Sequence, residues 1–230
     1  ELNSYTEKLN KELLNLAIPK NPNTKSRAKI TSILNSANET MTQIAFDFLD
    51  QNPFLGNEAK SLFCKKTDVL VTSIFNLVCE KFHPLTSRSR DQILSVVAIG
   101  GYGRGEMAPY SDIDLLFLSP YRQTGWTKSV VESVLYILWD LKFKVGHSSR
   151  TISDCVKLGL DDLTIRTSML EKRYLCGDKD LFDQLETTLR KKVFSRKASS
   201  FVEGKLSERT ERHLKHANAR YMLEPNIKEG

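Results

Sequence analysis

The 230-residue sequence lacks any apolar run long enough to cross a membrane. A transmembrane helix needs roughly 18 or more consecutive apolar residues, and no segment of the chain approaches that length. Internal repeats and low-complexity segments are also missing, and the beginning of the chain shows no signal-peptide pattern. Apolar residues make up 40% and charged residues 27% of the chain, which excludes a disordered tail. We therefore expect a globular protein that has no membrane partner.

Cysteine is scarce, and the few cysteines are far apart. The chain has four cysteines and four histidines, with no C-x-x-C pair and no metal-binding spacing among them. Zinc sites and disulfide frameworks usually show closer spacing. We expect four reduced thiols in a cytoplasmic protein. The cysteines are Cys64, Cys79, Cys155 and Cys176.

The charge is unbalanced towards the basic side, with a formal net charge of +6. Such a balance favours anionic partners, among them nucleotides, phosphates and nucleic acids. The Lys and Arg residues are dispersed, however, and no aromatic–basic motif accompanies them, so we expect no nucleic-acid partner. Because the first residue is Glu1 and not methionine, we also expect the chain to be a piece cut from a longer protein.

The periodicity of the apolar residues predicts an α+β fold. Residues 1–90 show helical spacing throughout, which predicts an N-terminal helical region, and residues 91–230 form the second unit. Short continuous apolar runs in the second unit predict buried strands at 93–99 and 113–118, and we expect a third strand at 143–151. The helices we expect span residues 9–18, 26–50, 58–82, 127–141, 153–162, 180–194 and 199–219. This order predicts a small sheet flanked by many helices.

One segment, residues 100–114, carries the pattern of a chemical site: GGYGRGEMAPYSDID. Four glycines within six residues follow a buried strand, so that the backbone can approach a ligand and turn N–H groups towards phosphate oxygens. A Rossmann loop would need a third glycine where Glu106 stands, and the chain has no P-loop motif. The glycines by themselves could equally form a simple tight turn.

Two aspartates follow the glycines at the start of a strand. Asp112 and Asp114 are separated by Ile113, so their carboxylates point to the same side while Ile113 points into the core. Neighbouring carboxylates repel each other unless a cation lies between them, and Mg²⁺ prefers such oxygen ligands together with substrate phosphates. Next to the glycine loop, the pair predicts a metal–triphosphate site for phosphoryl or nucleotidyl transfer.

The same residues resemble a known family. A Gly-Gly loop followed by Asp-x-Asp on a strand is similar to the polymerase-beta-like nucleotidyltransferase superfamily, and the fuller string is similar to its protein-PII uridylyltransferase branch. Further agreement comes from residues 144–151, 162–164, 170–173 and 223–228, so the resemblance extends from about Ile93 to the last residue.

The resemblance implies a small mixed sheet and transfer of UMP from UTP to a tyrosine hydroxyl of the PII nitrogen-signalling protein, with release of pyrophosphate. It assigns Asp112 and Asp114 as the catalytic, Mg²⁺-binding carboxylates. The nucleotide-binding residues that we expect are Gly100, Gly101, Arg104, Ser111, Arg150 and Lys228. Arg150 and Lys228 are the candidates for stabilising triphosphate charge. Whole enzymes of this family continue with a domain that removes UMP and with domains that sense glutamine, and we expect neither within these residues.

Several points stay open at this stage. The strand at 144–151 has no Asp or Glu to serve as a third metal ligand, and Asp154, Asp161, Asp162 and Glu171 are equal candidates. His147 could act as a base or serve only a structural role. An adenylyltransferase, a small-molecule nucleotidyltransferase and a non-catalytic nucleotide sensor remain alternatives, although a sensor has less need of two metal-binding carboxylates. The modified tyrosine and the oligomeric state also stay open.

Overall fold

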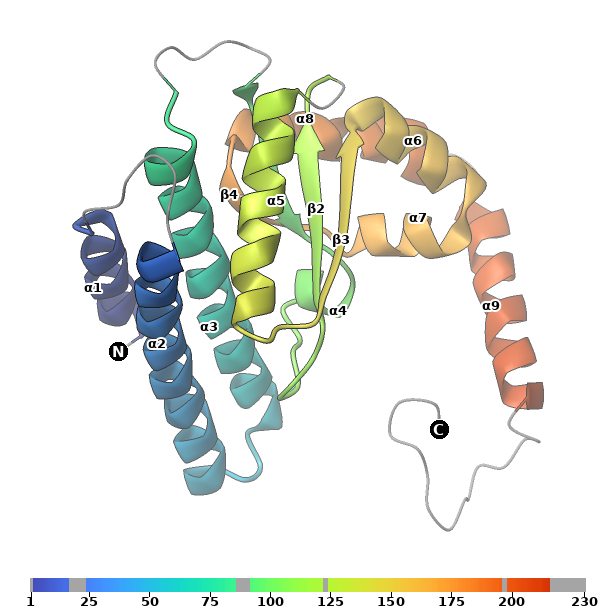
Figure 1. Ribbon diagram of the computed structural model, residues 1–230. Coiled ribbons are helices and arrows are strands. Elements are labelled where there is room, and N and C mark those ends of the chain that lie inside the picture. Colours follow the sequence, from blue (N-terminus) through green and yellow to red (C-terminus); the bar gives the residue numbers. More distant parts are fainter. Residues whose placement is uncertain (1, 17–23, 86–91, 122–123, 196–197, 216–230) are drawn as a thin grey trace.

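A computed structural model describes residues 2–16, 24–85, 92–121, 124–195 and 198–215 of the chain (Figure 1). It shows a four-stranded sheet with helices on both faces, which confirms the predicted α+β class. None of the helices in these ranges combines the length and the apolar composition that a membrane-spanning helix needs.

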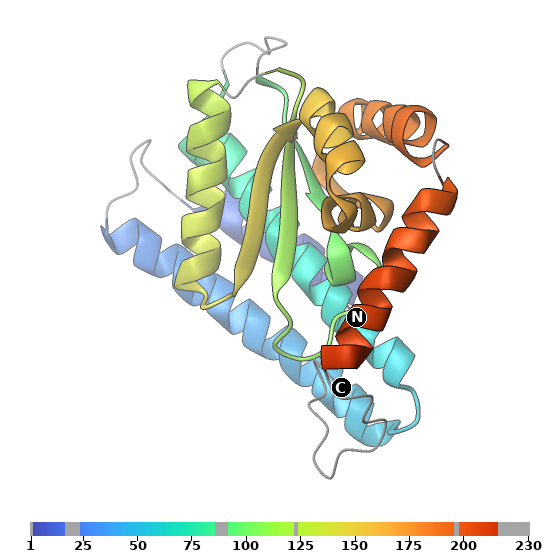
Figure 2. The same cartoon turned by 90° about the vertical axis from the view of Figure 1, so that its right-hand side faces the viewer.

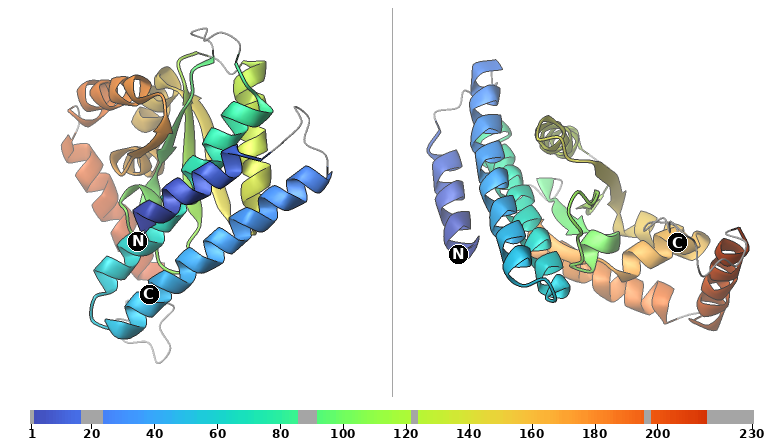
Figure 3. Two further views of the ribbon diagram at one scale, coloured as in Figure 1. Left: turned by 90° about the vertical axis from the view of Figure 1, so that its left-hand side faces the viewer. Right: turned by 90° about the horizontal axis from the view of Figure 1, so that it is seen from below.

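The N-terminal part is helical, as predicted. Helix α1 spans Leu2–Leu14, α2 spans Thr24–Gln51 and α3 spans Gly56–Leu77, and α3 continues into a π-helical turn over Val78–Phe82. The first helix begins and ends earlier than the apolar pattern indicated, whereas the other two match their predicted ranges within a few residues. The three helices lie side by side along one side of the molecule, and α3 is the one nearest the sheet (Figure 3).

The sheet contains β1 (Ser95–Ala98), β2 (Ile113–Ser119), β3 (Val145–Thr151) and β4 (Arg173–Gly177), in the order β3-β2-β1-β4. Strand β1 pairs antiparallel with β2 and β4, whereas β2 and β3 are parallel. The first three strands were predicted. Strand β4 was not, because it is a five-residue edge strand that begins with Arg173 and ends with a glycine and so lacks a clear apolar pattern.

The remaining helices surround the sheet (Figure 2). They are α4 (Gly100–Gly103), α5 (Gly125–Asp140), α6 (Ile152–Asp161), α7 (Leu163–Leu170), α8 (Lys179–Leu189, followed by a π-helical turn over Arg190–Phe194) and α9 (Ala198–Lys215). Helix α5 connects the parallel strands β2 and β3. Sequence reasoning missed α7 and treated α4 as part of a loop.

The sheet separates two apolar clusters, one on each of its faces. Ile113, Leu115 and Phe117 of β2 pack into a cluster with α1, α2, α3 and α5. Leu116 and Leu118, which alternate with them, pack into a second cluster with α6, α7 and α8. Because Asp114 belongs to the same alternate set as Leu116, it lies on the face covered by α6–α8. The four cysteines are free thiols, and three of them are buried.

Candidate active site

The two aspartates lie where β2 begins. Ile113 is fully buried between them, and its N–H donates to the Lys144 carbonyl at 2.8 Å, which fixes the start of the strand. Asp112 is exposed and Asp114 is half-buried. Ile113 therefore points into the core, and Asp114, the next residue of β2, belongs to the opposite face of the strand.

The Asp114 carboxylate has no cationic partner in the part of the chain that the structure describes. No hydrogen bond or ion pair joins the side chain of Asp112 or of Asp114 to another described residue. Burial, and secondly the charge of Asp112, raise the pKa of Asp114 above its ordinary value. A half-buried carboxylate beside a like charge is stabilised by a bound cation, and so these residues fit a divalent metal ion.

Two glycines leave space around the Asp114 carboxylate. Gly100 has a left-handed φ of +61°, and a Cβ there would lie 3.3 Å from Asp114 Oδ2. Gly146 is paired with Asp114 across the parallel β2–β3 ladder, and a Cβ at Gly146 would run into Asp114 Oδ1. Sequence reasoning named Gly100 but missed Gly146, although an isolated glycine within a strand is a signal of close approach.

The glycine segment, residues 100–105, is anchored next to the Asp114 carboxylate. The N–H of Ile99 donates to the Asp114 carbonyl at 3.1 Å, and α4 begins at the following residue, Gly100. The first N–H groups of a helix have no acceptor within the helix, and so they are free to donate to a ligand. Gly101 lies in this turn, and a Cβ at its position would make only ordinary contacts at 3.6 Å or more. The predicted Gly100–Gly101 segment therefore lies against the Asp114 carboxylate.

Ser111 shapes the turn that leads into Asp112. Its hydroxyl accepts from the Ala108 N–H at 3.1 Å, while its own N–H donates to the Ala108 carbonyl at 3.2 Å. Within this turn Tyr110 takes a left-handed φ of 65° and is 92% exposed. The structure thus gives Ser111 a role in positioning Asp112, and its predicted contact with a nucleotide stays a prediction.

Arg104 is held by two carboxylates. Its guanidinium lies 2.6 Å from Glu171 Oε1 and 3.2 Å from Glu106 Oε2, and these hydrogen bonds raise the pKa of Arg104 above its ordinary value, with Glu171 the main cause. The pair links the end of α4 to the residue that follows α7. To bind a phosphate, as predicted, Arg104 would have to exchange Glu171 for the ligand or share its guanidinium between them.

A second arginine, Arg173, connects the glycine segment to helix α3, and sequence reasoning missed this role. Arg173 of β4 donates to both carboxylate oxygens of Asp68 on α3, at 2.7 and 3.0 Å, and to the carbonyl of Tyr102 at 3.2 Å. Its guanidinium also lies over the Tyr102 ring, 5.4 Å from the centroid. The Asp68–Arg173 pair therefore connects the N-terminal helices to the turn that carries Gly100 and Gly101.

The other predicted residues lie further from the aspartates or outside the described part. Arg150 is on the same face of the sheet as Asp114, about 13 Å along β3 at roughly 3.3 Å per residue. Its buried Nη1 atom has no hydrogen-bond partner among the described residues. His147 lies on the opposite face, where its ring packs edge-on against Trp139 at 6.2 Å. Lys228 lies outside the described residues.

No third metal ligand emerges from the four candidates. Asp154 accepts from the N–H and hydroxyl of Thr151 in a capping box, Asp162 caps α7, and Glu171 binds Arg104. Asp161 is exposed. Among the described residues no three Asp, Glu, His or Cys side chains gather closely enough to hold a metal ion. An ion at Asp112 and Asp114 would complete its oxygen ligands from phosphates or water.

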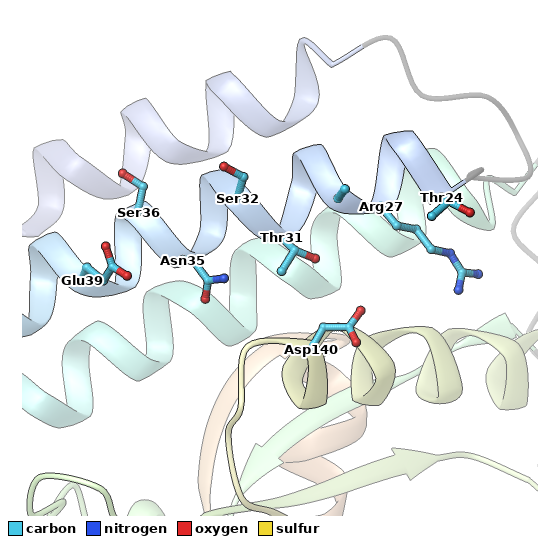
Figure 4. Close-up of a pocket in the computed structure, with 9 residues that line it drawn as sticks. Thr24, Arg27, Thr31, Ser32, Asn35, Ser36, Glu39 and Asp140 are labelled. Atoms are coloured by element: carbon cyan, nitrogen blue, oxygen red, sulfur yellow. The ribbon is translucent and has the colours of Figure 1, made fainter.

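The hollows of the surface do not all belong to this site. One hollow, of about 850 Å³, lies between α2 and the end of α5. Figure 4 shows Arg27, Thr31 and Asp140 among its polar side chains. Arg27 and Thr31 are spaced along α2, Asp140 lies across from them on α5, and the side chains do not converge on one point. We assign it no part in the chemistry.

Comparison with known proteins identifies the class. Residues 85–175 match the family model described as nucleotidyltransferase domain. This range contains β1, the glycine segment, both aspartates and β3, which are the features that the geometry singles out. The chain is therefore that of an enzyme of the nucleotidyltransferase class.

Further matches define the branch. Residues 200–230 match the model described as GlnD PII-uridylyltransferase. The bifunctional uridylyltransferase/uridylyl-removing enzyme of Ruegeria pomeroyi is 44% identical over 89% of this chain and 22% of its own length. The enzymes of that name from Cereibacter sphaeroides and Novosphingobium aromaticivorans are 51% and 41% identical, over 71% and 90% of this chain and 18% and 23% of their own lengths. The chain belongs to the branch of the PII uridylyltransferases, as the motifs predicted, and spans about a fifth of the length of these relatives.

Proposed function

We propose that the chain transfers UMP from UTP to a tyrosine hydroxyl of a PII-type signalling protein and releases pyrophosphate. The observation that carries the proposal is the carboxylate pair, Asp112 and Asp114, which has no side-chain partner among the described residues and lies next to the glycine segment at Gly100. The names of the relatives support the nucleotide, since each is called a uridylyltransferase, and the description of the family model that matches residues 200–230 supports a PII acceptor.

Asp112 and Asp114 would hold Mg²⁺, for which their oxygen ligands are suited. When bound, the ion would neutralise phosphate charge and orient the tyrosine oxygen towards the α-phosphorus. The residues of the chain supply the rest of the site. Ile113 fixes the spacing of the two carboxylates because it is fully buried between them. Gly146 and Gly100 keep the space beside Asp114 open for phosphate oxygens.

The first N–H groups of α4, at Gly100 and Gly101, would donate to the triphosphate. Arg150 would approach it from further along the same face of the sheet, since its buried Nη1 atom lacks a partner among the described residues. Ser111, Arg104 and Lys228 complete the proposed contacts. In this arrangement residues 91–230 form the transferase unit and residues 1–90 the N-terminal helical region, whose described helices α1, α2 and α3 pack behind the sheet. We place the enzyme in the cytoplasm, with no nucleic-acid or membrane partner and with glutamine regulating the full-length enzyme only.

The test is transfer of labelled UMP from UTP, with Mg²⁺, to a purified PII-type protein, and ATP serves as a parallel donor. The chain is compared with a variant that carries Asp112→Asn and Asp114→Asn, which preserves side-chain size and removes both charges. We expect label on a tyrosine from UTP alone, lost in the variant by a factor of about 10³ or more, since metal-ligand and electrostatic groups contribute on that scale. Equal transfer from ATP, or full activity of the variant, would refute the proposal.

A further inference from the structure

A pocket lies beside the carboxylate pair, on the side of the N-terminal helices. It has a volume of about 700 Å³ and is enclosed by α2, α3, the turn before β2 and the turn between α5 and β3. Ser111, which directly precedes Asp112, lines it, and so does Lys144, whose carbonyl holds Ile113 between the two aspartates. The right-hand view of Figure 3 faces this end of the molecule. The pocket and the metal-binding residues therefore share a wall of two short turns.

The pocket has an apolar floor. Phe46 and Phe63 pack edge to face with ring centroids 5.3 Å apart, and Met107 and Phe143 extend the same surface. Such a floor holds an apolar or aromatic side chain by excluding water from it.

One cation lies within this apolar surrounding. Lys66 is 8% exposed, and its ammonium donates to Asn38 Oδ1 at 2.6 Å and to Thr42 Oγ1 at 2.8 Å. It lies 5.7 Å from the centre of the Phe143 ring, and no carboxylate of a described residue pairs with it. Burial lowers the pKa of Lys66 to about 8. A buried ammonium with only neutral partners is stabilised by an anionic group that enters the pocket.

The rim of the pocket has the same sign of charge and one unusual aromatic residue. Lys142 and Lys144 are exposed lining residues, against a single acid, Glu39. Tyr110, also a lining residue, is 92% exposed. Its backbone has a left-handed φ, which residues other than Gly, Asn and Asp seldom adopt. An exposed tyrosine contributes little to the fold and is common where proteins contact each other.

We propose that this pocket binds the acceptor protein, taking up an apolar side chain and a neighbouring carboxylate from the segment that carries the modified tyrosine. The inference rests on the proposed transfer reaction and assigns its acceptor subsite. The occupant follows from position and charge, because two lining residues, Ser111 and Lys144, adjoin the residues of the carboxylate pair, and because the three lysines of the lining outnumber its one acid. In the proposed reaction the nucleotide lies on the opposite face of the sheet, the one to which Asp114 belongs.

The experiment measures two constants for each variant: the KM for the acceptor at saturating UTP, and the KM for UTP at saturating acceptor. Lys66→Met retains most of the side-chain volume and removes the charge. Tyr110→Asn removes the exposed ring and tolerates the left-handed backbone. Lys128→Met is the matched control, since Lys128 is 69% exposed on α5 and pairs with the exposed Glu132 of the same helix. We expect Lys66→Met to raise the acceptor KM about tenfold or more, the scale of losing one buried charged contact. Tyr110→Asn should raise it as well, because an aromatic contact with the acceptor is lost. The UTP KM and the control should be unchanged.

A second measurement separates the failure of this inference from failure of the proposed function. The affinity for an acceptor whose target tyrosine is replaced by phenylalanine is measured by calorimetry without UTP. Weaker binding to Lys66→Met, with circular dichroism unchanged, supports the pocket even if no transfer occurs. Unchanged binding and unchanged acceptor KM in both variants would overturn it, as would an equal rise of both KM values. Concentration-dependent self-association that Lys66→Met abolishes would assign the pocket to a second copy of the chain and would also overturn it.

Discussion

The Asp68–Arg173 pair gives the most quantitative prediction. Arg173 makes two hydrogen bonds to Asp68, and the two side chains are 33% and 28% exposed. Removing one partner of a buried ion pair costs about 3–5 kcal/mol, whereas exposed pairs contribute about 0–1 kcal/mol. For this intermediate exposure we expect Asp68→Asn to lower the free energy of unfolding by about 2 kcal/mol, or roughly 30-fold in the folding equilibrium.

Arg173→Met should cost more, because Arg173 also donates to the Tyr102 carbonyl and lies over its ring. A hydrogen bond of this kind adds about 1 kcal/mol and a cation–π contact about 0.5–1 kcal/mol. We therefore expect a loss of about 3–4 kcal/mol for Arg173→Met. Because Tyr102 belongs to the glycine segment, this variant should also raise the KM for UTP more than Asp68→Asn does.

The assay is urea unfolding followed by circular dichroism, with UTP kinetics on the same preparations. Glu132→Gln serves as the control, since it breaks an exposed i,i+4 pair with Lys128 and should cost no more than about 0.5 kcal/mol. If Asp68→Asn costs no more than Glu132→Gln, or if Arg173→Met leaves the UTP KM unchanged, the pair does not hold the glycine segment and the reasoning is wrong.

Three other outcomes follow from the same geometry. Asp114→Asn should raise the melting temperature of the metal-free protein at pH 7, because burial and the charge of Asp112 raise the pKa of Asp114 and so disfavour its charged form. Added Mg²⁺ should raise the melting temperature of the unsubstituted chain and leave that of the variant unchanged. Gly146→Ala should abolish transfer, since its Cβ would run into the Asp114 carboxylate, and a variant with normal kinetics would contradict this. Thr151→Ala should cost about 1 kcal/mol at pH 7 as a lost helix cap, with kinetics unchanged. The hydrogen bond from the Thr151 N–H is the main cause of the lowered pKa of Asp154. The stability that this cap contributes is therefore fully present above the ordinary pKa of an aspartate and is lost as the pH falls through the lowered pKa of Asp154. Unfolding measured as a function of pH should show this loss.

The sequence alone predicted the local features of the site. The alternation of Asp112, Ile113 and Asp114 dictates which side chains share a face, because that depends only on strand geometry. The glycines at 100–105 predicted a close backbone approach, and the long apolar patterns predicted α2, α3 and α5. The sequence also shows directly that the strand at 144–151 contains no Asp or Glu. Among the described residues no cluster of three possible metal ligands is found.

Only the tertiary structure decided how distant segments meet. Asp68 and Arg173 are 105 residues apart, and neither has a local signal of its partner. Strand β4 was missed because its stability comes from pairing with β1, across a register shift between Val96 and Val97, and not from a periodic pattern of its own. Gly146 became informative only once the β2–β3 register placed it opposite Asp114. Periodicity reports which side of an element is buried, whereas register, pairing and ion-pair partners depend on contacts between elements that the linear sequence does not order.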